Sequence, residues 1–201
     1  MLNARSVTFM MVVAMLAAGC GKKDGGSAQG ADPKAELAKA EKAVAGVNGL
    51  VPEALKGKLE FTAVLDAEKQ YAVVRPKGWD QKGLPGRVTP PDAAGLGFMT
   101  ALWTGSNCDG SCEKKDWAAV ADKVDFAQLK GQSFTTVKDE KRDGGRLLVA
   151  RSDDRAYVVW AQWKPDARRY FVCRATLDKE AAAALPAFEA ACAALRVVSW
   201  D

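Results

Sequence analysis

The chain has 201 residues, a formal net charge of +4 and no histidine. This mild charge is not that of a nucleic-acid-binding protein. The lack of histidine anywhere in the sequence excludes Ser-His-Asp and Cys-His catalysis within this chain, and it removes the commonest transition-metal ligand.

The segment 1–19 has the pattern of an export signal. Arg5 supplies positive charge at the start, and an apolar run over 7–18 follows, broken only by Thr8. A run of this length is too short to span a bilayer and is typical of the core of a signal peptide. The segment is therefore expected to be removed on export.

Small residues lead into the first cysteine, where Ala17, Ala18 and Gly19 precede Cys20. Together with the charge and the apolar run, they resemble the lipobox of bacterial lipoproteins, with Ala17 in place of the usual leucine. The resemblance implies cleavage before Cys20 and lipidation of Cys20 with acyl chains such as palmitate, which anchor the protein stably in a membrane. The alternative is an ordinary signal peptide cut elsewhere, with Cys20 incidental.

The segment 20–33 is polar and rich in glycine, serine and lysine, which predicts a flexible tether after the lipidated cysteine. Asp32 and Pro33 can then cap and open a helix. The few large apolar residues of this helix form only a thin stripe. We therefore predict a spacer helix at 34–50, with a helix resting lightly on the domain as the alternative.

The segment 51–201 is long enough for a single domain with its own core. Runs of alternating apolar residues and of β-branched residues predict strands, and apolar residues at helical spacing predict helices. A loop rich in glycine and proline separates the second strand from the third. The strands are expected at 58–65, 71–75, 96–103, 133–138, 146–151, 156–163 and 170–177, and the helices at 116–124 and 178–195.

This order of elements, with antiparallel hairpins near the end, indicates an α+β sandwich. We expect a mainly antiparallel sheet covered by helices, including a C-terminal helix. The segment 71–79 contains an aromatic residue that opens a strand and a Pro-x-Gly-Trp corner that follows it. The closing helix ends within the segment 188–198. With the order of the elements, these segments resemble the PsbP-like α/β sandwich of many small bacterial lipoproteins. That resemblance implies an architecture and no particular function.

Four cysteines remain besides Cys20, and an exported chain lies where disulfides form. On the last long strand Cys173 shares a face with the apolar residues at alternate positions, and Cys192 lies on the apolar stripe of the closing helix. If the helix covers that face, these two cysteines pair. Cys108 and Cys112 then form a local bridge that pins a loop. The alternative, a redox or copper pair, is disfavoured by the spacing and the lack of histidine.

Three tryptophans are candidates for a contact surface. Trp160 and Trp163 fall on opposite faces of one strand, so one of them is expected to pack under a helix and the other to be exposed. Trp103, beside the cysteine loop, is a candidate for a binding rim. No motif in the sequence indicates a catalytic residue, a cofactor or a metal site.

We expect a non-catalytic lipoprotein of the cell envelope, anchored to a membrane by its lipid. It would bind an envelope protein or a small ligand through one sheet face or the loop rich in glycine and proline, and no nucleic acid. Gly21 replaces the aspartate that retains some lipoproteins in the inner membrane, which favours the periplasmic side of the outer membrane. The alternatives are a thiol-disulfide or metal-handling factor that uses Cys108 and Cys112, and an enzyme with carboxylate, lysine or tyrosine catalysis.

Overall fold

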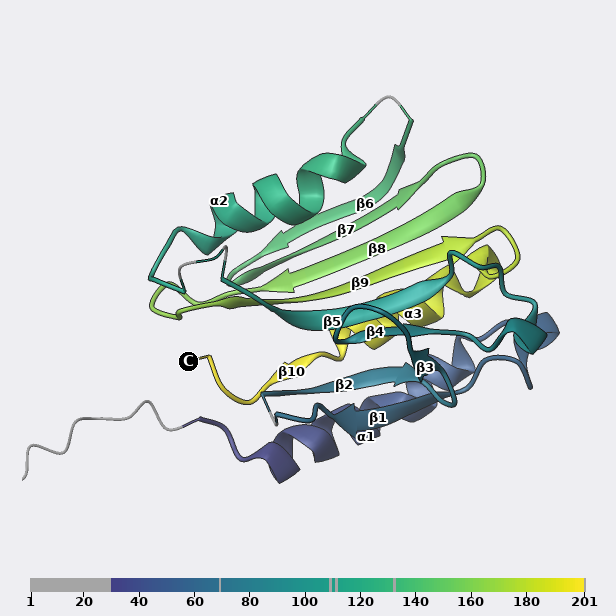
Figure 1. The fold of residues 1–201 in the computed structure, drawn as a ribbon, viewed down its shortest axis with the longest axis horizontal. Coiled ribbons are helices and arrows are strands. Elements are labelled where there is room, and N and C mark those ends of the chain that lie inside the picture. The colour runs from purple at the N-terminus through teal and green to yellow at the C-terminus, as the bar shows by residue number, and fades with distance from the viewer. Residues whose placement is uncertain (1–29, 69, 109, 111, 132, 201) are drawn as a thin grey trace, which may run out of the picture.

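The computed structural model describes residues 30–68, 70–108, 110, 112–131 and 133–200. They form two antiparallel β-sheets with helices packed on them (Figure 1). This confirms the α+β sandwich of mainly antiparallel sheet that the sequence predicts. The expected export signal and Cys20 lie outside the described residues.

The larger sheet has seven strands in the order β3-β4-β5-β9-β8-β7-β6, and each neighbouring pair is antiparallel. The strands are β3 (Asp80–Gln81), β4 (Arg87–Thr89), β5 (Ala101–Asn107), β6 (Thr135–Arg142), β7 (Gly145–Arg151), β8 (Arg155–Gln162) and β9 (Tyr170–Asp178).

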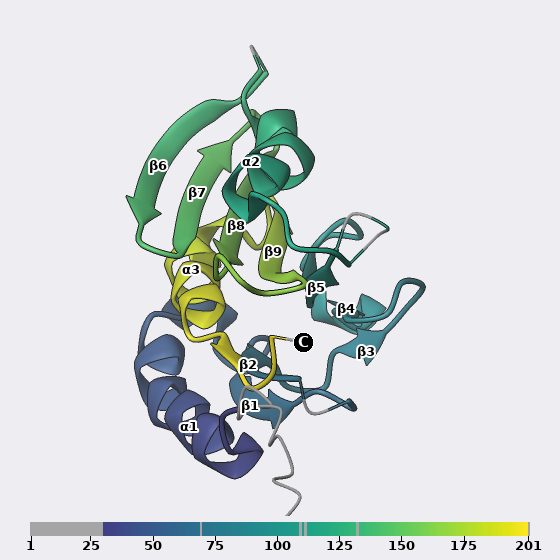
Figure 2. The same ribbon diagram turned by 90° about the vertical axis from the view of Figure 1, so that its left-hand side faces the viewer.

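Both faces of this sheet are covered, as Figure 2 shows, by α2 (Trp117–Ala121) on one side and α3 (Leu185–Ala193) on the other. Val158 and Trp160 of β8 belong to the core under α3, whereas Val159 and Ala161 belong to the core under α2. A strand buried on both faces reads as a nearly continuous apolar run. That is why β7, β8 and β9 were recognisable in the sequence.

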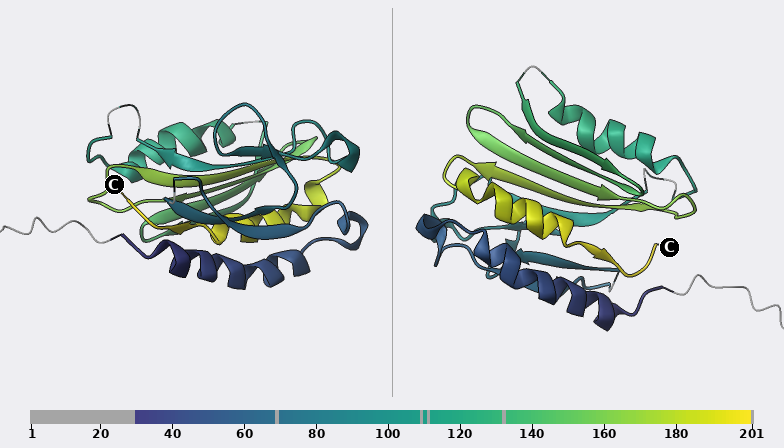
Figure 3. Two further views of the ribbon diagram at one scale, coloured as in Figure 1. Left: turned by 60° about the horizontal axis from the view of Figure 1, so that its bottom comes forward. Right: turned by 180° about the vertical axis from the view of Figure 1, so that it is seen from behind.

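The smaller sheet has three strands in the order β1-β2-β10, namely β1 (Phe61–Leu65), β2 (Tyr71–Pro76) and β10 (Arg196–Val197). The helix α1 (Pro33–Gly49) packs against β1, β2 and α3 (Figure 3). One core lies between the small sheet, α1, α3 and the large sheet, and a second lies under α2.

The prediction of a spacer helix at 34–50 is wrong, because α1 is part of the domain. Ala40 and Val47 are fully buried on its inner face, and Asp32 caps its first turn. The buried stripe is made largely of small residues, which allow close approach to the sheet but give little apolar contrast in the sequence. The domain therefore begins at α1 and not at residue 51.

Asn48 joins α1 to the small sheet through two hydrogen bonds. Its amide nitrogen donates to the Phe61 carbonyl oxygen at 3.0 Å, and its Oδ1 accepts from the Phe61 amide at 2.7 Å. We expect Asn48→Ala to lower the free energy of unfolding by about 2 kcal/mol, because both groups of Phe61 lose their partner. Urea unfolding measures this. The exposed Lys42→Ala on the same helix should change it by less than about 0.5 kcal/mol, and equal effects would contradict the role of Asn48.

Two predicted boundaries shift, one because of tertiary contacts and one because of a proline. The strand expected at 96–103 is β5, which starts only at Ala101. Before it, the Met99 amide donates to Asp178 Oδ2 at 2.9 Å and the Asp178 amide donates to Thr100 Oγ1 at 3.0 Å, so this stretch forms a loop. The helix expected at 178–195 is α3, which starts at Leu185 because Pro186 occupies its first turn.

The two strands β3 and β4 lie within the loop expected to follow the second strand. They are two and three residues long, too short to give a periodic signal. They extend the large sheet past β5 and bring the loop rich in glycine and proline beside the small sheet (Figure 2).

Arg146 anchors the edge strand β6 to the helical segment after α2. It is 5% exposed, donates to both carboxylate oxygens of Asp139 at 2.8 and 2.6 Å, and also pairs with Asp122. Hydrogen bonding to Arg146 lowers the pKa of Asp139, and hydrogen bonding to Lys130, with a smaller contribution from Arg146, lowers that of Asp122.

Because the folded pKa of Asp139 lies below its unfolded value, the stability from this pair is present above about pH 4 and is lost as the pH falls through the folded pKa. We expect Asp139→Asn to lower the free energy of unfolding at pH 7 by about 1–2 kcal/mol, after allowance for solvent screening. Urea unfolding from pH 7 to pH 2.5 should show the gap between the two proteins closing at the acid end. A constant gap would contradict this.

Candidate functional site: a cleft between the two sheets

A cleft of about 870 Å³ opens between the β1–β2 hairpin and the β4–β5 end of the large sheet. This volume lies in the range of small-ligand sites, about 300–1,000 Å³. Its walls combine apolar and aromatic side chains with charged ones. The side chains used below are Val64, Asp66, Glu68, Tyr71, Val73, Arg75, Leu84, Arg87, Met99, Trp103 and Arg174.

Strand β2 supplies the floor of the cleft. Tyr71, Val73 and Arg75 alternate along it and all line the cleft, because successive side chains of a strand point to opposite faces. Four residues of strand rise separate Tyr71 from Arg75, which is about 13 Å.

Tyr71 joins the two sheets across the cleft. Its hydroxyl donates to the Thr104 carbonyl oxygen at 3.1 Å, and its ring meets Phe171 edge to face with 5.8 Å between centroids. Burial raises the pKa of Tyr71 above its ordinary value of 10.0. The phenol is therefore neutral at physiological pH and is not an activated base or nucleophile, so its part in the cleft is structural.

The large sheet contributes Trp103 and Arg174. The Trp103 indole nitrogen donates to the Pro85 carbonyl oxygen at 2.9 Å, and the Arg174 guanidinium lies 5.0 Å from the ring centroid. Arg174 pairs with the fully buried Asp125, which also accepts from the Tyr170 hydroxyl at 2.6 Å. Burial lowers the pKa of Arg174. Asp125 compensates the charge of Arg174, so the two present a fixed wall.

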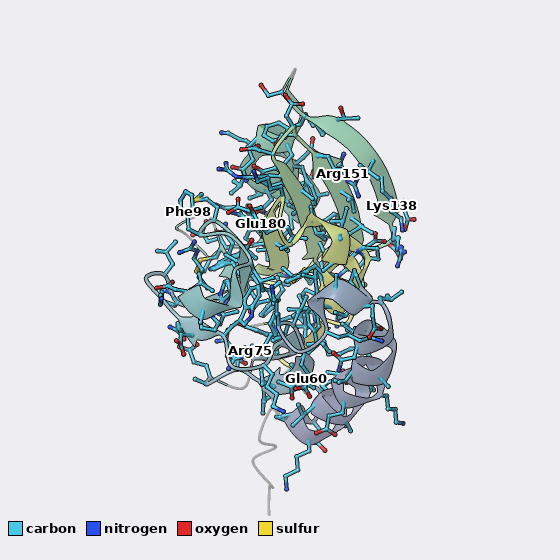
Figure 4. The ribbon with its side chains drawn as sticks, turned by 90° about the vertical axis from the view of Figure 1, so that its right-hand side faces the viewer. Glu60, Arg75, Phe98, Lys138, Arg151 and Glu180 are labelled. Atoms are coloured by element: carbon cyan, nitrogen blue, oxygen red, sulfur yellow. A yellow bond between two sulfur atoms is a disulfide. The ribbon has the colours of Figure 1, made fainter. Side chains whose placement is uncertain are left out.

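The other charged side chains of the cleft are of both signs. Asp66 accepts from the Tyr71 amide at 2.7 Å and the Glu68 amide at 3.1 Å, so its carboxylate is held at the β1–β2 turn. Arg75 and Arg87 are half-buried and have no hydrogen-bond or ion-pair partner among the residues that the structure describes. Figure 4 labels Arg75 beside the small sheet.

A second hollow of about 480 Å³ shares Arg87 with the cleft. It is lined by the loop that carries Phe98, whose side chain is 87% exposed. Figure 4 labels Phe98 at the edge of the molecule. The contacts of Met99 and Thr100 with Asp178 hold this loop, so an exposed aromatic ring stands on an ordered support.

Of the predicted contact tryptophans, Trp103 lies in the wall of the cleft, and its role in binding stays a prediction. Trp160 is 7% exposed and belongs to the core under α3, which confirms that one of the two strand tryptophans packs under a helix and removes Trp160 from the contact surface. Trp163 is half-buried against the core under α2, on the opposite face as expected. It is not an exposed surface aromatic.

Both predicted disulfides are formed. Cys173 joins Cys192, and Cys108 joins Cys112. Use of the second pair in redox chemistry stays untested. Among the described residues no group of three or more cysteine, aspartate or glutamate side chains could hold a metal ion. Within the same part of the chain, no helix has both the length and the apolar character needed to cross a membrane.

The charged residues of the cleft were missed in the sequence. The alternation of Tyr71, Val73 and Arg75 was a usable signal, since a polar residue on an otherwise apolar strand face points to a site. Arg87 had no such signal, because it reaches the cleft only through the pairing of β4 with β5.

No protein-family model matches the chain, and no curated protein matches it either. Among solved structures, the Ran-binding protein Mog1p of Saccharomyces cerevisiae overlaps 70% of this chain and 97% of its own, with 10% identity and a TM-score of 0.40. A mutant of Mog1 gives the same values. A TM-score at this level carries no inference about this chain.

Proposed function

We propose that this protein is a lipid-anchored, non-catalytic binding module of the bacterial cell envelope, held in a membrane through Cys20. The support for the anchor is the charged start, the short apolar run and the small residues before Cys20. The periplasmic side of the outer membrane is the favoured location, because glycine and not aspartate follows Cys20.

We expect Cys20→Ser to abolish membrane attachment, because the serine cannot accept the thioether-linked lipid. The measurement is fractionation of cells grown with radiolabelled palmitate. The original protein should carry label in the membrane fraction, and Cys20→Ser should carry none there. The Cys108→Ser/Cys112→Ser variant is the matched control and should keep its label. Label retained after loss of Cys20 would refute the anchor.

The cleft carries the proposal of binding. A guanidinium without a protein partner can bind an anionic group of a ligand with two hydrogen bonds. Arg75 and Arg87 have no such partner among the described residues, and they line a cleft of ligand size. No residue of the cleft is set up as a base or nucleophile by its contacts, and this supports a binding role. We also propose that the sandwich is of the PsbP-like kind, on the corner at 71–79 and the closing helix.

Photo-crosslinking in living cells tests whether the cleft is the binding surface. A photoreactive amino acid placed at Leu84, which lines the cleft and is 67% exposed, should give a discrete adduct detected as an added mass. The matched position is Val137 on the far edge of the large sheet, which is 55% exposed and apolar as well. No adduct at 84, or the same adduct at both positions, would refute binding through the cleft.

A further inference from the structure

The charges in the cleft are separated by sign. Asp66 and Glu68 lie at the β1–β2 turn, before Tyr71, whereas Arg75 lies four residues further along β2. The cleft therefore has an acidic end and a basic end along one strand.

Contacts with β5 on the opposite wall show which of its residues lie at each end of the cleft. Arg169 bonds both Gln70 and Ser106, at 3.2 and 3.4 Å, so the turn end of β2 lies level with the end of β5. The Tyr71 hydroxyl reaches Thr104, two residues earlier on β5. Continuing this course places Arg75 toward Ala101 and Met99, which also line the cleft.

Arg87 lies opposite Trp103 in the pairing of β4 with β5, between the two ends of the cleft. It lines the cleft and also the hollow formed by residues 95–98, which precede Met99 in the chain. The guanidinium group of Arg75, which has no partner among the described residues, thus stands at one end, and two carboxylates stand at the other. Asp66 uses its oxygens on two backbone amides, but a carboxylate has about four acceptor positions. Both carboxylates can therefore still bind a cation.

Between the two ends the walls combine apolar side chains with Arg87 and the Asp125-paired Arg174. Val64 and Val73 face the cleft from the small sheet, and Trp103 faces it from the large one. A ligand with only a negative charge would be repelled by the carboxylates at the acidic end. A ligand with only a positive charge would be repelled by the guanidinium at the basic end. The matching ligand carries a positive and a negative group at opposite ends of a partly apolar body.

We propose that the cleft binds a short, extended peptide of about four residues with free termini. The span from Tyr71 to Arg75 is about 13 Å, and an extended chain covers at most about 3.3–3.6 Å per residue. The peptide's ammonium group pairs with Asp66 and Glu68, and its carboxylate pairs with Arg75. Arginine suits the second role because its fork matches a carboxylate with two hydrogen bonds. This assignment rests on the proposed binding function.

Calorimetric titration of the full chain in mild detergent tests the assignment. The probes are alanyl-leucyl-valyl-alanine with free termini, its N-acetylated form, its C-terminal amide and the dipeptide alanyl-alanine. A charge-assisted hydrogen bond is worth at least about a factor of ten in affinity. Each blocked form should therefore bind at least about tenfold more weakly than the free tetrapeptide, and so should the dipeptide, which cannot reach both ends.

Variants assign the two ends. Arg75→Gln should weaken the free tetrapeptide at least about tenfold and leave the affinity for its amide unchanged. Glu68→Gln should also weaken the free tetrapeptide at least about tenfold, and it should leave the affinity for the N-acetylated form unchanged. The matched controls are Arg151→Gln and Glu180→Gln, exposed residues of the same charges that Figure 4 labels over the large sheet. They should leave all affinities within about twofold.

The assignment falls if the free tetrapeptide binds no more tightly than its blocked forms. It also falls if Arg75→Gln weakens the free and amidated peptides equally, or if no peptide binds. Crosslinking at Leu84 separates this failure from failure of the proposed function. An adduct in cells without peptide binding leaves the binding function standing and removes the peptide, whereas absence of both removes the function as well.

Discussion

Replacing Phe188 with alanine is expected to lower the free energy of unfolding by about 4 kcal/mol. Phe188 is fully buried on α3. Its ring meets Phe61 edge to face at 5.1 Å and lies 5.8 Å from the Trp79 ring. It therefore joins the closing helix to the small sheet, and its removal leaves a cavity that several elements would have to move together to fill.

Urea unfolding monitored by circular dichroism measures the effect. Phe98→Ala is the matched control, since its ring is 87% exposed and it should change the free energy by less than about 0.5 kcal/mol. An effect of Phe188→Ala below about 2 kcal/mol would mean that the core can close around the missing ring.

Removing the disulfide between Cys173 and Cys192 is expected to cost about 3 kcal/mol. The bridge spans a sequence separation of 19 and ties α3 to β9, and both cysteines are fully buried. Without it, the unfolded chain regains the freedom that closing a loop of this size removes, worth about 3 kcal/mol. The Cys173→Ala/Cys192→Ala variant should therefore unfold at a lower urea concentration.

The Cys108–Cys112 bridge provides the comparison. It spans a sequence separation of 4, and the same loop relation gives about 2 kcal/mol for a loop of about five residues. The Cys108→Ala/Cys112→Ala variant should thus be the less destabilised of the two under non-reducing conditions. The reverse order would show that native packing around the local loop matters more than loop length.

The disulfides show how far local patterns can reach. The face of β9 and the stripe of α3 were both visible as periodicities, so the pairing of Cys173 with Cys192 followed once the helix was placed over the strand. The strands β7, β8 and β9 were equally clear, because burial on both faces leaves long apolar runs.

Docking of α1 was not predictable in the same way. Its contact with the domain is made through Ala40, Val47 and the side-chain amide of Asn48, which are small or polar. The start of β5 was equally hidden, since Asp178, distant in sequence, accepts from the Met99 amide and donates its own amide to Thr100 Oγ1. In both places non-local contacts override local propensity.

The sequence by itself determined the α+β class, the closing helix and the two cysteine pairs, because each depends on periodicity or on short contiguous segments. Asp66, Glu68 and Arg75 lie on one hairpin, and only the tertiary structure set the opposite wall with Arg87 and Trp103 against them to form a cleft. That arrangement depends on the short strands β3 and β4 extending the large sheet and on the small sheet packing beside it. No local pattern encodes such a meeting, since the residues of the two walls share neither a strand face nor a helix turn.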